Sequence, residues 1–179
     1  VKVANTSHGT FYLYFSNKED LFRALALDVA EQMMQLAEDL PAIVPEPAGF
    51  IELRSWLDRF GELYDHYGPI IRAWTGVEIG GSEFGRLGND VRGEFTRGLA
   101  GRIRAARPAG ISAAVAALAV VAMVERFNYY VLSRQVKVDR DDMLDTLAVV
   151  IHRGVFNGQG PAPNDGARST RPAVSSRRR

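Results

Sequence analysis

The sequence contains no cysteine, so the chain forms no disulfide bonds, offers no thiolate nucleophile and has no cysteine ligands for zinc. Its three histidines, His8, His66 and His152, are too scattered to indicate a metal site, and we expect no cofactor. A Ser-His-Asp pattern of recognisable spacing, a phosphate-binding glycine loop and an HExxH motif are also absent. These absences predict a protein that is not an enzyme.

Long hydrophobic runs are missing too. The longest uncharged apolar run covers residues 111–124, which is shorter than the roughly 20 residues that cross a bilayer. We therefore interpret this run as a helix buried on all sides, and we expect no membrane partner. The sequence also opens without the basic and then apolar pattern of a secretion signal, so we predict a cytoplasmic protein.

Charge of one sign does not dominate the chain, whose net charge is +1. The charge is unevenly distributed, because residues 158–179 contain five arginines and one aspartate and the preceding residues are slightly acidic. A contact with nucleic acid must therefore be local rather than spread over a basic surface. Residues 158–179 are also rich in Gly, Pro and Ser without apolar periodicity, so we expect a disordered basic tail there.

Apolar residues recur at steps of three and four over most of the chain, which is the spacing of helices with one buried face. The predicted helices cover about three quarters of the chain, more than twice the usual helical share, and they indicate an all-α fold. Their expected ranges are 7–15, 17–40, 49–67, 69–79, 83–107, 111–135 and 140–156.

The expected helix ends follow from capping residues and helix breakers. Ser16, with a glutamate three residues further on, forms a capping box in front of the second helix. Asp139 or Asp142 caps the last helix, which places carboxylates at its positive end. Gly68 and Pro69 predict a turn between the third and fourth helices.

The most informative segment covers residues 7–18. Its aromatic and branched residues fit a strand, whereas Ser7 is a good N-cap and Phe11 and Phe15 share one helical face. In the helical interpretation the residues between these two phenylalanines lie on other faces, and the tyrosines among them form an exposed patch. Such a patch on a short helix indicates a binding partner.

The pattern of this segment is specific. Its residues are Gly9, Thr10, Phe11, Tyr12, Tyr14 and Phe15, followed by Lys18, Glu19, Leu21 and Phe22. They closely resemble the recognition helix of TetR-family transcriptional regulators, and residues 4–7 resemble the preceding turn, with Asn5 where the family usually has glycine. The resemblance covers about residues 4–22. It implies that the first helix of the DNA-binding head and most of the second are absent from this chain.

The resemblance implies a direct role in DNA binding, because the second helix of such a motif enters the major groove with its first residues at base edges. The residues implied to face bases are Ser7, His8 and Gly9. The residues implied to contact phosphates are Thr10, Tyr12 and Lys18. Those implied to lie against bases or sugars are Leu13 and Tyr14. In the alternative, the tyrosines only pack against the protein and the lysine is a solvated charge.

The rest of the chain agrees with the regulatory domain of that family, which binds a small molecule in a helical cavity and dimerises through its last two long helices. Aromatic residues on the helical stripes are candidates for lining such a cavity and hint at a hydrophobic effector. The alternative for most of them is an ordinary core position. The candidates are Trp56, Phe60, Tyr64, Trp74, Phe84, Phe95, Phe127 and Tyr130.

A homodimer is expected through residues 111–135 and 140–156. The first of these helices is apolar on every side, so that one side would face the core and the other a partner chain. The second carries a matching apolar stripe, which consists of Leu144, Leu147, Ile151 and Val155. The alternative is a central helix within a monomer.

The sequence therefore predicts a DNA-binding transcriptional regulator, a repressor that a small molecule releases from a palindromic operator. The alternative is a helical ligand-binding or dimerisation module that does not bind DNA in this form. The predicted organisation is a partial helix-turn-helix at residues 1–22, a regulatory and dimerisation domain at 23–157 and the basic tail at 158–179.

Overall fold

The structure, a computed structural model, describes residues 17–75, 83–132 and 135–158, and every regular element in these ranges is a helix. The all-α prediction is therefore confirmed. The helices are α2 (Lys18–Glu38), α3 (Pro47–Thr75), α4 (Glu83–Ala106), α5 (Ala113–Leu132) and α6 (Arg140–Phe156). The predicted helix at residues 7–15 and the basic tail beyond residue 158 lie outside the described residues.

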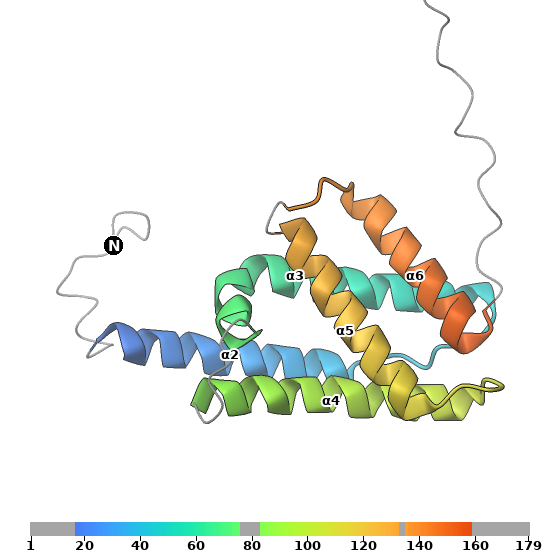
Figure 1. Cartoon of the computed structure of the whole chain (residues 1–179), viewed down its shortest axis with the longest axis horizontal. Helices are drawn as coiled ribbons and strands as arrows, with labels where there is room; N and C mark the ends of the chain where they lie inside the picture. Colours follow the sequence, from blue (N-terminus) through green and yellow to red (C-terminus); the bar gives the residue numbers. More distant parts are fainter. Residues whose placement is uncertain (1–16, 76–82, 133–134, 159–179) are drawn as a thin grey trace, which may run out of the picture.

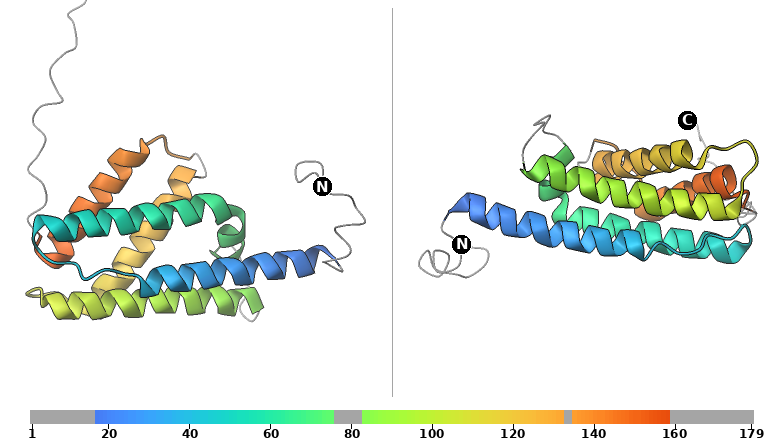
Figure 2. Two further views of the ribbon diagram at one scale, coloured as in Figure 1. Left: turned by 180° about the vertical axis from the view of Figure 1, so that it is seen from behind. Right: turned by 90° about the horizontal axis from the view of Figure 1, so that it is seen from below.

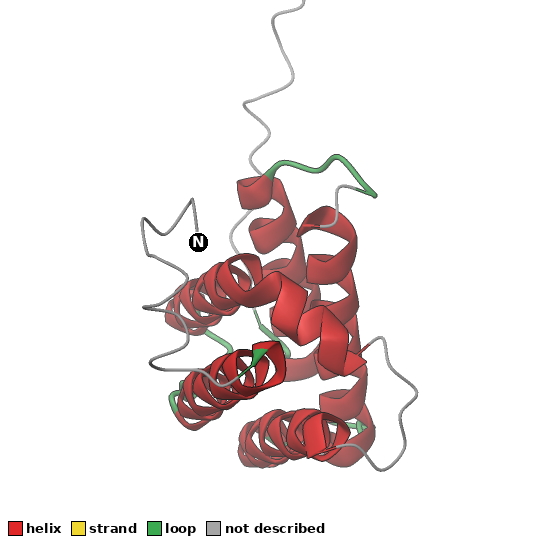
Figure 3. Cartoon of the chain, turned by 90° about the vertical axis from the view of Figure 1, so that its left-hand side faces the viewer, coloured by secondary structure: helices red, strands yellow, loops and turns green. Residues whose placement is uncertain are grey.

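The helices pack as a bundle in which α2 lies between α3 and α4. α2 and α4 run side by side in the same direction, and α3 runs in the opposite direction (Figure 1). α5 crosses α4 diagonally, and α6 packs on α3 (Figures 1 and 2). The N-terminal end of α2 projects beyond the rest of the bundle (Figure 2), and Figure 3 looks along α2, α3 and α4, with α5 and α6 inclined to them.

α2 begins at Lys18, one residue later than predicted. The side chain of Asn17 accepts a hydrogen bond from the backbone N–H of Asp20 at 2.7 Å, so Asn17 and not Ser16 is the N-cap. Asparagine caps helices as well as serine does, because its side-chain oxygen reaches the same unpaired N–H groups. The helix then continues through the predicted domain boundary between residues 22 and 23 without a break.

α3 is one helix where a turn and two helices were predicted. Gly68 and Pro69 lie inside it, and the helix bends near its C-terminal end (Figure 1). Proline removes one backbone hydrogen bond and pushes against the preceding turn, which commonly bends a helix without ending it. The helix continues past the bend, and Ile71 is buried in the core.

α6 has the predicted bounds and is fastened to α3 by two arginines. Its N-cap is Asp139, which accepts from the N–H groups of the second and third following residues. Arg54 on α3 pairs with Asp141 and Asp145 on α6. The hydrogen bond to Asp145 raises the pKa of Arg54, while partial burial acts in the opposite direction. Arg140 of α6 donates to the side-chain carboxylate and to the backbone carbonyl oxygen of Asp58 on α3.

The apolar stripe of α6 packs within its own chain. Leu144, Leu147 and Ile151 are buried in the core, and Val155 packs against it. The prediction that this stripe meets a partner chain is therefore wrong, because α3 covers it first. The next residue after the stripe, Phe156, is buried as well and closes the C-terminal end of the helix.

α5 is only partly buried, so the prediction of burial on all sides is wrong for the single chain. Ala117, Val120 and Val124 face the core, whereas Val115 is 68% exposed and Leu118 is 54% exposed. This arrangement also excludes the alternative of a central helix within a monomer. Among the described helices, α5 is the one long and apolar enough, by length and composition alone, to cross a membrane.

The linker between α2 and α3 is fixed by close backbone packing. His152 of α6 is fully buried, and its Nε2 atom lies 2.7 Å from the carbonyl oxygen of Val44. A carbonyl oxygen only accepts hydrogen bonds, so Nε2 carries the proton and donates it. Gly49 at the start of α3 approaches the same linker so closely that a Cβ atom there would lie 1.9 Å from the Val44 oxygen.

Candidate functional site

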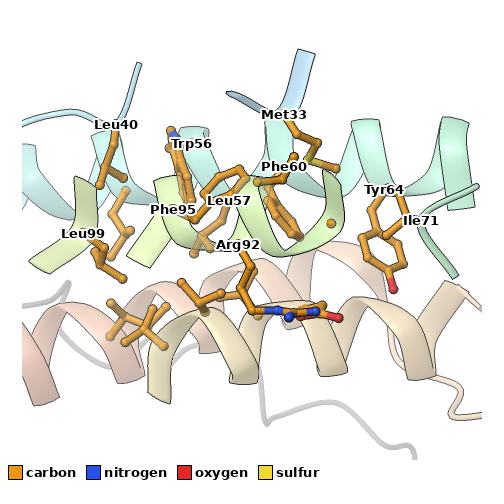
Figure 4. A pocket seen from close by; sticks show the side chains of 18 residues that line it. Met33, Leu40, Trp56, Leu57, Phe60, Tyr64, Ile71, Arg92, Phe95 and Leu99 are labelled. Atoms are coloured by element: carbon orange, nitrogen blue, oxygen red, sulfur yellow. The ribbon is translucent and has the colours of Figure 1, made fainter. Parts of the chain in front are cut away.

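A small apolar cavity lies in the middle of the bundle, between α3, α4 and α5 (Figure 4). Its volume is about 70 Å³. Met33 of α2 and Leu40 just beyond its end contribute to the wall, and α6 contributes Ile151. The lining is aliphatic or aromatic except for Gly88, Arg92, Glu125 and the hydroxyl group of Tyr64. All five described helices therefore meet at this cavity.

Four of the predicted aromatic residues surround the cavity. Trp56, Phe60 and Tyr64 form one row along α3, and Phe95 faces them from α4 (Figure 4). The ring of Phe95 stands edge-on to Trp56 and to Phe60, with ring centres 5.8 and 5.7 Å apart. This edge-to-face geometry is the favoured arrangement of aromatic rings and holds the wall in shape. That these residues bind a ligand remains a prediction.

The other predicted aromatic residues lie elsewhere. Phe127 is 37% exposed on α5 and does not line the cavity, because the helix turns its side chain away from the core. Tyr130 is also exposed, and the guanidinium group of Arg126 lies over its ring at 6.0 Å. Trp74 and Phe84 belong to α3 and α4, and their side chains lie outside the described residues.

Two side chains tie the cavity wall to the C-terminal end of α2. The indole Nε1 of Trp56 donates to the carbonyl oxygen of Leu36 at 2.9 Å. Arg102 on α4 donates from Nε and Nη2 to the carbonyl oxygen of Leu40, at 3.0 and 2.7 Å. These bonds satisfy carbonyl groups at or just beyond the helix end, where intrahelical partners run out. Neither bond could be predicted from the sequence, since each joins residues far apart in the chain.

A third connection joins α2 to α3 nearer the projecting end. Tyr67 donates to the carboxylate of Asp28 at 2.9 Å, and the amide of Gln32 donates to the Tyr67 hydroxyl at 2.7 Å. α2 is thus attached to the bundle at three successive levels. The N-terminal end of α2 projects from the bundle (Figure 1), although Ala26 still lies in the core.

The charged part of the cavity wall lies between α4 and α5. Arg92 of α4 and Glu125 of α5 both line the cavity, with 3.8 Å between Nε and Oε2. The Nη1 atom of Arg92 also donates to the side-chain oxygen of Asn89 at 3.0 Å. Glu125 therefore forms an ion pair across the two helices.

An exposed apolar face runs along α5. The two large side chains of this face are Val115 and Leu118. Three exposed small residues surround them: Ala114, Ala119 and Ala122. No charged side chain interrupts this stretch, which ends at Arg126. A face of this kind on a surface helix is typical of a protein–protein contact.

Of the predicted DNA-binding residues, the structure describes only Lys18. It is exposed and is the first residue of α2, at the end of the helix that projects from the bundle. Helix N-termini favour phosphate groups, because unpaired N–H groups point out of them. The remaining predicted contacts, Ser7, His8, Gly9, Thr10, Tyr12, Leu13 and Tyr14, lie outside the described residues.

The N-terminal part of the chain matches a known protein family. The model described as "Bacterial regulatory proteins, tetR family" matches residues 1–25. No curated protein matches the chain. The family match confirms the resemblance drawn from the sequence, and it extends into the first turns of α2.

Proposed function

We propose that this chain, whose residues 1–25 match the family model, is a DNA-binding transcriptional regulator of the TetR family, and that it is a repressor released from its operator by a small apolar molecule. The observation that carries the proposal is the continuity of α2. Its first residues belong to the matched segment, and Met33 of the same helix lines the cavity, as does Leu40 just beyond the helix end. A ligand that displaces the cavity wall therefore acts on the helix that follows the DNA-reading segment.

The size of the cavity supports a change of shape on binding. A cavity of about 150 Å³ accommodates benzene, and this one has less than half that volume. An apolar ligand of ordinary size fits only if the helices around the cavity move apart. A ligand that binds the widened form alone shifts the protein toward it, which is the requirement for release by an effector.

The wider assignments follow the same proposal. Residues 23–157 form the regulatory and dimerisation unit, residues 1–22 belong to the DNA-binding region, and residues 158–179 form a basic tail. Regulators of this family are generally not enzymes, and we propose the same for this chain. A regulator of DNA works in the cytoplasm. We propose further that a second copy of the chain, and not a membrane, covers the apolar face of α5.

The DNA-binding roles divide into contacts that read bases and contacts that hold phosphates. We propose that Thr10, Tyr12 and Lys18 contact phosphates, and that His8 lies at a base edge with Ser7 and Gly9 beside it. Leu13 and Tyr14 would lie against bases or sugars. A dimer presents two such segments related by a two-fold axis, so the operator should be a near-palindrome.

The test selects duplexes from a random pool with the full chain and measures affinity for single-base variants of the selected site at several salt concentrations. Lys18→Ala should weaken binding to every variant about equally and lower the salt slope by about one unit. His8→Ala should cost about 1–3 kcal/mol at one position of the site and change the preferred base there. The matched control is Lys137→Ala, because Lys137 is exposed in the loop before α6 and should leave binding unchanged.

Two results would contradict the proposal. A reshuffled base preference in Lys18→Ala, with an unchanged one in His8→Ala, would show that the base and phosphate roles are reversed. If the chain binds no duplex while small molecules still stabilise it, then it is the ligand-binding module without DNA binding.

A further inference from the structure

The polar part of the cavity wall carries information about the ligand. One cation and one anion line the cavity, so its wall has no net charge. The other polar side-chain groups of the lining residues are the Tyr64 hydroxyl and the indole N–H of Trp56, which donates to the Leu36 carbonyl. Arg92 and Glu125 come from different helices, and their side chains are 39% and 23% exposed. The two side chains lie where α4 contacts α5, at the edge of the apolar interior.

The two charged groups are close without being hydrogen-bonded to each other. Their nearest atoms, Nε of Arg92 and Oε2 of Glu125, are 3.8 Å apart, whereas N–H···O hydrogen bonds span about 2.7–3.2 Å. An oxygen atom placed about 2.8 Å from both atoms completes a triangle with this separation. Such an oxygen would accept from Arg92, and if it carries a proton it would donate to Glu125.

Charged ligand groups suit this position less well. A carboxylate near Arg92 is also close to Glu125, and an ammonium group near Glu125 is also close to Arg92. Each would either meet a like charge in a partly desolvated site or separate the pair and leave one member without its partner. A hydroxyl group satisfies both members at once and leaves the pair intact.

We propose, as a refinement that rests on the ligand-responsive function above, that the cavity selects an uncharged molecule with an apolar body and one hydroxyl group, which bridges Arg92 and Glu125. The apolar body lies among the side chains of Trp56, Phe60 and Phe95. The pair therefore selects the head group of the effector, and the aromatic row accommodates its body.

The test compares three probes with the same six-carbon body: 1-hexanol, hexanoate and hexylammonium. Their binding to the full chain is followed by tryptophan fluorescence, which reports on Trp56 at the cavity, and by the shift of the melting temperature. We expect 1-hexanol to bind about tenfold more tightly than either charged probe, because each charged probe meets a like charge in this partly desolvated site.

Two variants reverse the selection if the assignment is right. Glu125→Gln removes the negative charge and should move the preference toward hexanoate. Arg92→Gln removes the positive charge and should move it toward hexylammonium. Arg97→Gln is the matched control, because Arg97 lies on the same helix, pairs with Glu94 and does not line the cavity. It should preserve the wild-type order of the probes.

The outcomes separate the refinement from the function on which it rests. If the three probes bind equally, or if a charged probe binds best to the wild type, the head-group assignment is overturned while the cavity remains a ligand site. If none of the probes changes the fluorescence or the melting temperature at millimolar concentration, the cavity is an ordinary core defect and the ligand-responsive function fails as well. The wild-type ranking decides the question even where a variant does not fold.

Discussion

Gly49 and Gly101 both lie in helices, yet replacement by alanine should have opposite effects at the two positions. A Cβ atom at Gly49 would meet the backbone of Val44 at 1.9 Å, whereas one at Gly101 would have no atom within 4 Å. We expect Gly49→Ala to lower the free energy of unfolding by about 1–3 kcal/mol, the usual cost of overpacking. Gly101→Ala should raise it by up to about 1 kcal/mol, because alanine favours the helix.

Urea unfolding followed by circular dichroism measures both effects, at one protein concentration so that any association contributes equally. If Gly49→Ala stabilised the protein instead, the linker before α3 would have to shift away from the new methyl group at little cost. It would then have to move as a unit with His152, whose imidazole donates to the same Val44 carbonyl.

Single side chains show how far the sequence can predict a site. The helical stripe on α3 placed Trp56, Phe60 and Tyr64 on one face, and they do lie together at the cavity. The same reasoning grouped Phe127 with them, because a helix that is apolar all round does not reveal which of its sides is inward. The buried polar residue His152 was not predicted to have a role, since its partner is a backbone carbonyl distant in sequence.

At the scale of the helix, the end of α2 depends on a side chain from another helix. α2 has no basic residue in its last turn, and Arg102 of α4 donates twice to the carbonyl of Leu40 just beyond it. Arg102→Ala should lower the free energy of unfolding by about 1.5–3 kcal/mol, the range for hydrogen bonds that involve a charged group. Arg102→Lys should recover only part of this, because an ammonium group lacks the planar fork.

The control for this prediction is Arg104→Ala, two residues further along α4, because Arg104 is exposed and its side chain forms no hydrogen bond or ion pair with the described residues of α2. Chemical denaturation of the three variants at equal concentration gives the comparison. Equal stability of Arg102→Ala and Arg104→Ala would mean that water caps α2 as well as the guanidinium group does.

Helix ends were predictable where a local signal existed. Asp139 caps α6 at the expected residue, because the cap depends only on neighbours in the sequence. The bend in α3 was misread as an end, since Pro69 gives the same local signal in both cases and the packing beyond it decides. The stripe of α6 was real, but periodicity alone does not tell whether α3 or another chain covers it.

For the whole molecule, the exposed face of α5 predicts association. Leu118→Arg should convert a dimer to a monomer, because it places a charge in an apolar contact without a partner. Ile51→Arg is the matched control, since Ile51 is 65% exposed on α3, and it should remain dimeric. Light scattering coupled to size-exclusion chromatography gives the mass of each variant.

A wild-type chain that is monomeric at micromolar concentration would contradict this proposal. Association with lipid vesicles by the wild type, lost in Leu118→Arg, would instead assign the face to a membrane. Substitutions at Val120 or Leu147 do not test the interface, because both side chains are buried within the chain's own core.

The three attachments of α2 have a mechanical consequence. Its 21 residues form a rod about 30 Å long, with its C-terminal end secured by Trp56 and Arg102. If the rod tilts about that end by about 5°, its far tip travels about 2.6 Å, roughly half the rise of one helical turn. A small displacement of Met33 in the cavity wall would thus be amplified several-fold at Lys18, which is what the proposed release from DNA by a small effector requires.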